Sequence, residues 1–257
     1  MAKIISIFNH AGGTGKSTLT QNLGHQLAVR GNRTLLIDFD PQGSLSIFCG
    51  LDPMQITRTL REPLLSETPQ LDETLPLIEE LENLHLIPTN LLFAEVEQEL
   101  VIQMNREVRL KDVLAPLRRR YDFIVIDCPP SLGLLSINAL AASTHLIIPI
   151  QTQFKATIAI NGLLRTYRLV RDRLNKNLRI AGVVPMIHDN TSHSGETLST
   201  ISSTLGEVAT VFEPIPKSAV FPVASQRGLP VARHTRDKRY QHIIQLFDRL
   251  AKAVEEL

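Results

Sequence analysis

Short apolar runs alternate with helical patterns along most of this chain. Each run is four to seven residues long and carries few polar side chains, without the in-and-out alternation of a half-exposed strand. Such runs are typical of strands that are buried on both faces, as in a parallel sheet between layers of helices. We therefore predict strands at residues 4–8, 34–38, 84–88, 123–127, 145–150 and 180–184, with a weaker strand pattern at 208–212.

Between these runs, apolar side chains recur at helical spacing. The first helix is predicted from about Ser17 to Gly31, because glycine is a common helix stop. The last helix is amphipathic, with Ile243, Phe247 and Leu250 on one face. Residues 51–82 are rich in Pro, Thr and Glu and are predicted to form short helices and surface loops. The predicted helices cover residues 17–31, 92–103, 109–119, 156–176, 194–206 and 238–256.

The alternation of strands and helices predicts an α/β fold: a doubly wound, mostly parallel sheet flanked by helices. The chain has 257 residues and 43% hydrophobic content, which is enough to fill one large core. Because no stretch has the composition of a linker, we expect residues 1–257 to form a single domain.

A glycine-rich turn joins the first predicted strand to the first predicted helix. Its glycines allow the backbone to curl and turn N–H groups inward, and the helix N-terminus adds further donors. This context is typical of a P-loop NTPase, in which Lys16 would contact the β- and γ-phosphates and Ser17 would bind Mg²⁺. An ordinary glycine turn is the less favoured alternative. The predicted nucleotide-binding residues here are Gly12, Gly13, Thr14, Gly15, Lys16, Ser17 and Thr18.

Acidic residues end two of the predicted strands. Asp38 and Asp40 occupy alternate positions, so they point the same way, and Asp127 ends the most apolar strand. Ligands of such sheets lie at the carboxyl ends of the strands, where these acids fall beside the glycine turn. One acid can then bind Mg²⁺ while another orients a water for attack on the γ-phosphate. The alternative is that they are turn or helix-capping residues.

These motifs resemble the ParA/MinD family of positioning ATPases, whose deviant Walker A box has the tight form of residues 12–17. The resemblance extends to Asp38–Gly43, Ile126–Ser131 and Ile215–Lys217, so it covers most of the chain. It implies that Asp40 serves hydrolysis, that Asp38, Asp127 and Ser17 support Mg²⁺, and that Pro216 lies beside the adenine. It also implies an ATP-sandwich homodimer, nonspecific DNA binding, and a partner protein that stimulates hydrolysis.

One position departs from the family pattern. The family normally has a second lysine just before the glycine pair, and this chain has Ala11 there. We hypothesise that Lys155 supplies the missing cation to the partner's ATP; a solvated surface lysine is the alternative. The loss also resembles the ATPases that distribute carboxysomes (the maintenance of carboxysome distribution A, or McdA, group), which would make the adaptor McdB-like. A short plasmid or chromosome partition ATPase is the other candidate.

Two basic clusters are candidates for DNA binding. From 165 to 179 there are six basic residues and one acid, so this stretch carries +5 in a chain of net charge +1. Phosphate contacts need only positive charge and reach, which suits sequence-independent binding; a solvated helix exterior is the alternative. The predicted DNA-binding residues are Arg165, Arg168, Arg173, Lys176 and Arg179, and then Arg236, Lys238 and Arg239.

Other functions are less favoured by the sequence. Cys49 and Cys128 provide no set of iron–sulfur or zinc ligands. The acidic end of the chain, at residues 253–257, does not suit a membrane-binding helix, and the P-loop lies too near Met1 for a preceding helix-turn-helix. We therefore expect a cytoplasmic, nucleoid-associated protein without a membrane partner. A metabolic P-loop enzyme and a DNA-binding scaffold that does not hydrolyse ATP remain as alternatives.

Overall fold

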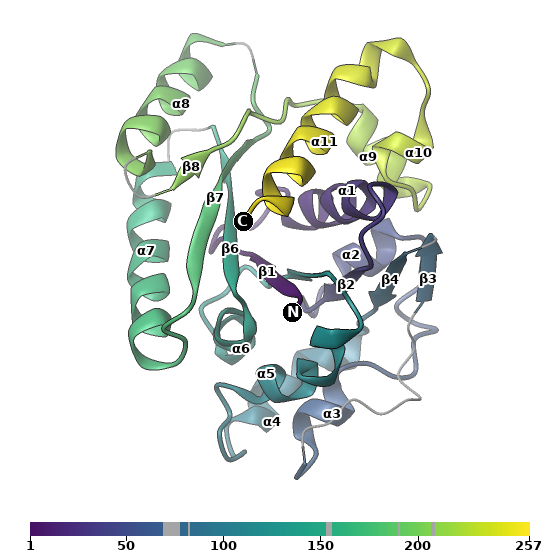
Figure 1. Ribbon diagram of the computed structural model, residues 1–257, viewed down its shortest axis with the longest axis vertical. Helices are drawn as coiled ribbons and strands as arrows, with labels where there is room; N and C mark the ends of the chain where they lie inside the picture. Colours follow the sequence, from purple (N-terminus) through teal and green to yellow (C-terminus); the bar gives the residue numbers. More distant parts are fainter. Residues whose placement is uncertain (69–77, 82, 153–155, 190, 207–208) are drawn as a thin grey trace.

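The protein is built around a central twisted sheet (Figure 1). The computed structural model describes residues 1–257 except 69–77, 82, 153–155, 190 and 207–208. Within these residues the sheet has eight strands in the order β3-β4-β2-β5-β1-β6-β7-β8, all parallel except the edge strand β3. The strands are β1 (Lys3–Ile7), β2 (Thr34–Asp38), β3 (Ile78–Leu81), β4 (Leu84–Ile87), β5 (Phe123–Asp127), β6 (His145–Gln151), β7 (Arg179–Met186) and β8 (Thr210–Val211).

Helices cover both faces of this sheet, and each face has its own hydrophobic core. Figure 1 shows α1 and α11 side by side on one face, where they contact each other. That face carries α1 (Lys16–Val29), α2 (Ser44–Phe48), α9 (Val220–Gln226), α10 (Val231–His234) and α11 (Gln241–Glu255). The other carries α3 (Arg61–Leu65), α4 (Val96–Leu100), α5 (Arg109–Leu114), α6 (Leu134–Ala142), α7 (Ala156–Arg173) and α8 (Ser192–Leu205).

The strand alternation decides which side chains reach which face. In β2, Leu35 and Ile37 join the core under α3–α8, whereas Leu36 joins the core under α1. Successive side chains point to opposite faces, so the next position on the α1 side after Leu36 is Asp38. By the same alternation in β5, Asp127 follows Val125 on the α1 side. The acids that end both strands are thus directed toward the helix that begins with the glycine turn.

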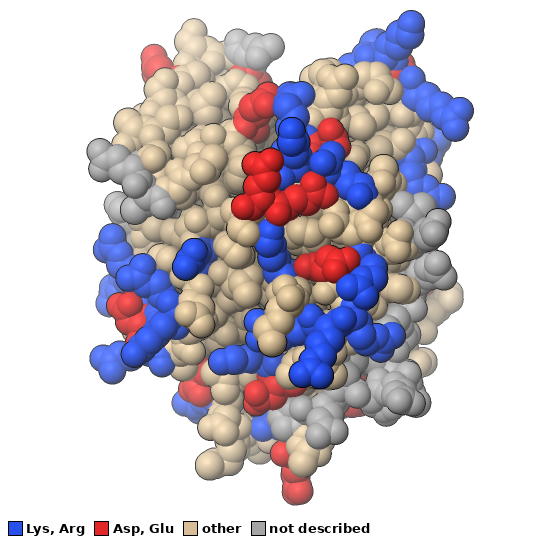
Figure 2. Space-filling view, viewed as in Figure 1, with Lys and Arg blue, Asp and Glu red and all other residues tan. Residues whose placement is uncertain are grey.

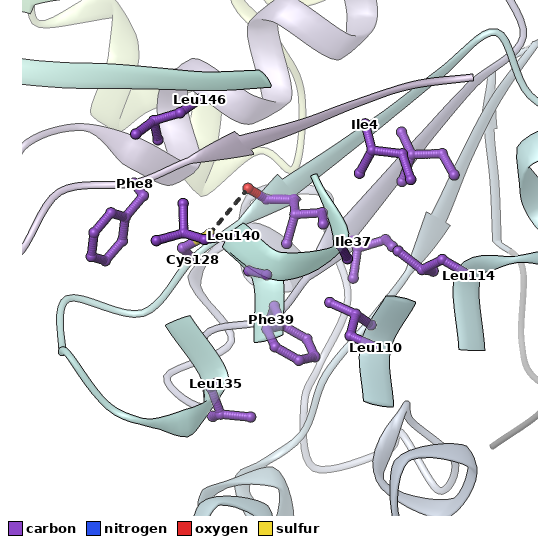
Figure 3. Packing of buried hydrophobic residues seen from close by; sticks show 14 of the residues in the cluster. Ile4, Phe8, Ile37, Phe39, Leu110, Leu114, Cys128, Leu135, Leu140 and Leu146 are labelled. Carbon is purple, nitrogen blue, oxygen red and sulfur yellow. Dashed lines mark hydrogen bonds between the residues drawn. The ribbon is translucent and has the colours of Figure 1, made fainter. Parts of the chain in front are cut away.

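The residue after each of these strands packs on the opposite face. Phe8, Phe39 and Cys128 follow β1, β2 and β5, and each is fully buried. Figure 3 shows these three side chains converging with Leu135 and Leu140 of α6 in one apolar cluster. This packing anchors the start of each loop at the carboxyl edge of the sheet.

Several predicted helices differ from the structure. The helix predicted at 92–103 is a 3₁₀ turn, η1 (Leu91–Glu95), followed by the short α4, and it ends where exposed β-branched residues begin at Val101 and Ile102. The helix predicted at 109–119 divides at Pro116 into α5 and the 3₁₀ helix η2 (Pro116–Arg119), because proline cannot continue the hydrogen-bond ladder. Similarly, residues 238–240 form the 3₁₀ turn η3 (Lys238–Tyr240) before α11.

The sequence pattern did not predict five elements, α2, α6, α9, α10 and β3. Helix α6 is apolar on nearly every side and so lacks the polar stripe that marks a surface helix. The doubly wound, mostly parallel sheet itself is confirmed. Among the described helices, none is long and apolar enough to cross a bilayer.

Candidate functional site

The glycine turn between β1 and α1 has a conformation that requires glycine. Gly13 has φ of 70° and Gly15 has φ of 81°, both in the left-handed region that side chains disfavour. At Gly15 a Cβ would also lie 2.8 Å from the Cε of Met186, which is closer than carbon atoms pack. Helix α1 begins at the next residue, Lys16, so its unpaired N–H groups face the same turn.

Side chains from neighbouring strands hold this turn in place. Asn9 donates from Nδ2 to the carbonyl of Pro149 at 2.6 Å and accepts from the N–H of Ala11 at 3.1 Å. Gln151, at the end of β6, donates from Nε2 to the carbonyl of Gly13 at 2.6 Å. Contacts with the neighbouring strand β6 therefore hold the turn in addition to its own contacts.

Lys16 is buried without a hydrogen bond to a carboxylate among the described residues. Its side chain donates from Nζ to the carbonyl of Ala11 at 3.1 Å, and the residue is only 7% exposed. Burial lowers the pKa of Lys16, while the negative charges of Asp127 and Asp40 oppose the shift. A charged ammonium in this position would gain from an anion in the turn.

Asp38 and Asp127 lie side by side because β2 and β5 are paired in register at these two residues. Asp38 accepts at Oδ2 from both the N–H and the hydroxyl of Ser46 at 2.7 Å, but its Oδ1 has no partner among the described residues. Neither carboxylate oxygen of Asp127 has a geometric hydrogen-bond partner within those same residues. Two buried acids with this spare accepting capacity are suited to a bound cation.

The three acids have raised pKa values. Burial raises the pKa of Asp38 to about 7. Burial, and then the charge of Asp38, raises the pKa of Asp127 well above its usual range. Burial also raises the pKa of Asp40, although this residue accepts from the N–H of Gln42 at 3.0 Å. A divalent cation would favour the ionised form of each and reverse these shifts.

The acids alone do not form a complete metal cage. In the part of the chain that the structure describes, no group of three or more His, Cys, Asp or Glu residues is arranged to hold a metal ion. Magnesium usually takes only one or two carboxylates in nucleotide sites and completes its shell with water and phosphate oxygens. The unpartnered oxygens of Asp127 and Asp38, beside the turn that carries Ser17, fit such a partial set of ligands.

A cavity of about 720 Å³ opens in front of the glycine turn. This volume lies within the range of small-molecule sites. Its lining includes Asp40 and residues 12–18 of the glycine turn. The apolar part of the lining, which we call the apolar wall, consists of Met186, Ile187, Ile215, Pro216, Phe221 and Pro222.

Pro216 belongs to this apolar wall because its loop is tied to the end of β7. His188 donates from its N–H to the carbonyl of Ile215 at 3.0 Å, and Lys217 donates to the carbonyl of His188 at 2.7 Å. Phe221 and Ile187, which line the cavity together with Pro216, were not predicted from the sequence. No motif marks them, and their positions depend on how β7 and α9 meet. A cavity that combines an apolar wall with a phosphate-type turn is suited to a molecule with a flat ring and an anionic tail.

The other predicted site residues lie outside this cavity. Lys155 falls outside the described residues. All of the predicted DNA-binding residues are exposed. Those on and after α7 are separated from the group before α11, since Figure 1 shows α7 on one side of the molecule and α10 on the other. Of the second group, Arg239 forms an ion pair with Asp237 at 2.7 Å, which offsets its charge.

The fold and the glycine turn define a P-loop NTPase. A family model described as "AAA domain" matches residues 2–180. The chain is 42% identical to the sporulation initiation inhibitor protein Soj of Bacillus subtilis over 195 residues, which are 76% of each chain. It is 36% identical to the chromosome-partitioning ATPase Soj of Treponema pallidum, over 91% of this chain and 90% of that one. The chain therefore belongs to the ParA/MinD-type family of AAA-domain P-loop ATPases.

Solved structures support the same fold. One described as cobyrinic acid a,c-diamide synthase of Mycobacterium smegmatis, with bound ADP and magnesium, is 32% identical, with a TM-score of 0.79 over 88% of this chain and 92% of that one. A Cyanothece McdA variant in complex with ATP has a TM-score of 0.86 over 98% of this chain and 96% of that one. Its identity is 23%, so this likeness concerns the fold alone.

The raised pKa of Asp38 predicts how stability depends on pH without ligand. The folded protein holds the carboxyl proton of Asp38 more tightly than the unfolded chain does, since the pKa of an aspartate in an unfolded chain is about 4. The free energy of unfolding should therefore decrease as pH rises from about 4 toward 7. In Asp38→Asn this decrease should shrink by an amount on the order of 2 kcal/mol. Urea unfolding between pH 5 and pH 8, with a chelator and no nucleotide, measures it.

Asp52→Asn is the matched control for this experiment. Asp52 is exposed and lies outside the cavity, so the variant should keep the wild-type pH dependence. An unchanged pH dependence in Asp38→Asn would contradict the prediction.

Proposed function

We propose that this protein is a ParA-type ATPase that binds ATP with Mg²⁺ and hydrolyses it to ADP and phosphate, acting as a single domain over residues 1–257. The observation that carries the proposal is one cavity bordered by a left-handed glycine turn, a buried lysine and an apolar wall, next to buried acids with unpartnered oxygens. The related structure with bound ADP and magnesium supports the choice of ligand.

Each end of ATP has a proposed partner in this cavity. The N–H groups of Gly12–Thr18 and the ammonium of Lys16 bind the phosphates. Ser17 and Asp127 hold Mg²⁺, with Asp38 supporting them from the adjacent strand; the ion neutralises charge on the phosphates. Pro216, with the neighbouring apolar side chains, contacts the adenine.

Asp40 is the proposed residue for orienting the attacking water. It lines the cavity and is not committed to an ion pair in the described residues. Asp40→Ala should lower ATP turnover by about 100-fold or more, because it removes a group that acts on the reacting water. ATP binding should change little, since the glycine turn and Lys16 are untouched. Phosphate release and ATP affinity are measured in parallel.

Asp52→Ala serves as a control, since this exposed acid lies outside the cavity. Full turnover by Asp40→Ala would reject the assigned role. If wild type itself had no turnover, the alternative of a non-hydrolysing DNA-binding scaffold would be favoured. Turnover that rises only with a small acid or amine would favour a metabolic enzyme, such as the synthase named for one related structure.

The ATP-bound protein is proposed to form a sandwich homodimer in which Lys155 reaches the partner's ATP. The basis is Ala11, whose methyl group cannot offset charge on the γ-phosphate. Lys155→Ala should then lose ATP-dependent dimerisation and turnover while still binding ATP as a monomer. Size-exclusion chromatography with light scattering, with ATP or ADP, tests this. Intact dimerisation in the variant would exclude the role, and Lys176→Ala is a control of equal charge change.

DNA binding is proposed for the exposed basic residues on and after α7. We call them the α7 basic cluster: Arg165, Arg168, Arg173, Lys176 and Arg179. None of these five forms an ion pair within the described residues. A homodimer would present the cluster twice, which makes binding depend on ATP. A separate, weaker contact with DNA is proposed for three other basic residues, Arg236, Lys238 and Arg239.

Replacing Arg168 and Arg173 with alanine should weaken DNA binding in the ATP state for every DNA sequence alike. The slope of log affinity against log salt should fall by about one for each phosphate group that the variant no longer binds. Fluorescence anisotropy with ATP, ADP or no nucleotide, over a salt series, measures both effects. Lys252→Ala, an exposed lysine on α11, is the control. Binding that is indifferent to nucleotide or salt would contradict the proposal.

The cargo of the protein has two candidates. The similar protein of Treponema pallidum is named a chromosome-partitioning ATPase, which favours a plasmid or chromosome partition ATPase. Carboxysome positioning with an McdB-like adaptor rests on Ala11, since the likeness to McdA concerns only the fold. In either case we propose that a partner protein stimulates hydrolysis and that the protein acts in the cytoplasm on the nucleoid. Pull-down of such an adaptor with the ATP-bound protein distinguishes the two cargoes.

A further inference from the structure

A second cavity lies at the opposite edge of the sheet from the glycine turn. Its volume is about 480 Å³. Strands β1 and β5 begin at it, with Lys3 and Phe123, and β2 begins one residue after Arg33. These strands have five residues each, so the two cavities are separated by roughly 15 Å of sheet. The cavity is lined by Met1, Lys3, Asn32, Arg33, Arg118, Arg119, Tyr121, Asp122 and Phe123.

The side chains of this cavity are unbalanced in charge. Four of them are basic and only Asp122 is acidic. Both oxygens of Asp122 are engaged by one partner: Arg33 donates from Nη2 to Oδ1 at 2.9 Å, from Nε to Oδ2 at 3.1 Å, and from its N–H to Oδ2 at 2.9 Å. Arg33 accordingly lowers the pKa of Asp122. Asp122 thus neutralises the charge of Arg33. The cavity lining contains no second carboxylate for the other three basic residues, Lys3, Arg118 and Arg119.

Two of these basic residues have no side-chain partner among the described residues. Neither Arg118 nor Arg119 makes a side-chain hydrogen bond or an ion pair in that part of the chain. The Nε of Arg118 is moreover buried from solvent, which is costly for a charged donor. The backbone here is held in place, because the carbonyl of Arg118 accepts from the N–H of Ala2 at 3.0 Å. A guanidinium without a carboxylate partner is well suited to an anion.

The third base, Lys3, adds charge without a neutralising partner in the cavity lining. Its Nζ donates to the carbonyl of Glu255 at 2.6 Å and lies 5.6 Å from the centre of the Phe123 ring. Both contacts are with neutral groups. Phe123 and Tyr121 are buried, so the cavity has an apolar floor beneath its cations. In the view of Figure 2, several Lys and Arg side chains surround the region where Figure 1 marks the N-terminus.

We propose that this cavity binds a small phosphorylated molecule through a phosphate or diphosphate group held by Arg118, Arg119 and Lys3. Guanidinium groups match phosphate oxygens in geometry, and the volume is that of a small-ligand site. A DNA backbone shares this chemistry, but it can bind to cations on any exposed surface, whereas these three cations line one cavity of small-ligand size. The site is separate from the proposed ATP site and goes beyond the proposed function.

Inorganic pyrophosphate is the probe, and calorimetric titration of the full chain is the measurement. The glycine turn is disabled with Lys16→Ala, so that the remaining binding reports on the second cavity. In this background Arg118→Gln should weaken binding roughly tenfold or more, because it removes a charged hydrogen bond. Arg120→Gln is the matched control: it has the same charge change nearby, and Arg120 does not line the cavity. Its affinity should stay close to that of the background.

Pyrophosphate titration of the chain that keeps Lys16 is a second test, and it does not depend on whether the Lys16→Ala variant folds. Two pyrophosphate sites are expected there, and Arg118→Gln should remove one while the other remains. Absence of a second site, or equal effects of Arg118→Gln and Arg120→Gln, would overturn the proposal. A short DNA duplex is titrated in parallel. If Arg118→Gln weakened only DNA binding and pyrophosphate did not bind, the cavity would be a DNA contact and the proposal would be wrong.

Discussion

The paired register of β2 and β5 is the constraint on which the site depends. It puts Asp38 beside Asp127 at the carboxyl edge of the sheet, on the face covered by α1. Neither acid has solvent around it, and the ammonium of Lys16 is close enough to affect the pKa of Asp127 without bonding to it. The protein thus holds two acids and one lysine in a place where water does not screen their charges. Phosphate and a divalent cation would satisfy all three groups together.

The rest of the carboxyl edge fixes these groups rather than neutralising them. Ser46, in the first turn of α2, takes only one oxygen of Asp38 and leaves the other free of a partner in the described residues. Gln151 at the end of β6 and Asn9 just after β1 hold the glycine turn, and Phe8, Phe39 and Cys128 anchor the loops from the opposite face of the sheet. Because the supports are apolar contacts and backbone hydrogen bonds, the charged groups remain available to a ligand. Preorganisation of this kind lowers the cost of binding.

The sequence predicted the sheet well because its strands are continuous apolar runs, and it predicted the phosphate side of the cavity because glycine, lysine and aspartate form a local motif. Apart from Pro216, it could not predict the apolar wall, since Phe221 and Ile187 have ordinary surroundings in the sequence and meet only through tertiary packing. Helix α6 was missed because it lacks a polar face. The two predicted DNA clusters look alike in sequence, yet they lie on different sides of the fold, which composition cannot reveal.

The bond between Lys3 and the carbonyl of Glu255 has a consequence for the connectivity of the chain. It joins the first strand to the end of the last helix, which Arg30 also clamps through Glu255 and Asp248. The first and last elements are therefore neighbours in space, and a short linker between them would leave the sheet order intact. Such a circular permutation would allow the chain to begin and end in a surface loop instead. The strands would then be synthesised in a different order, while their order in the sheet stayed the same.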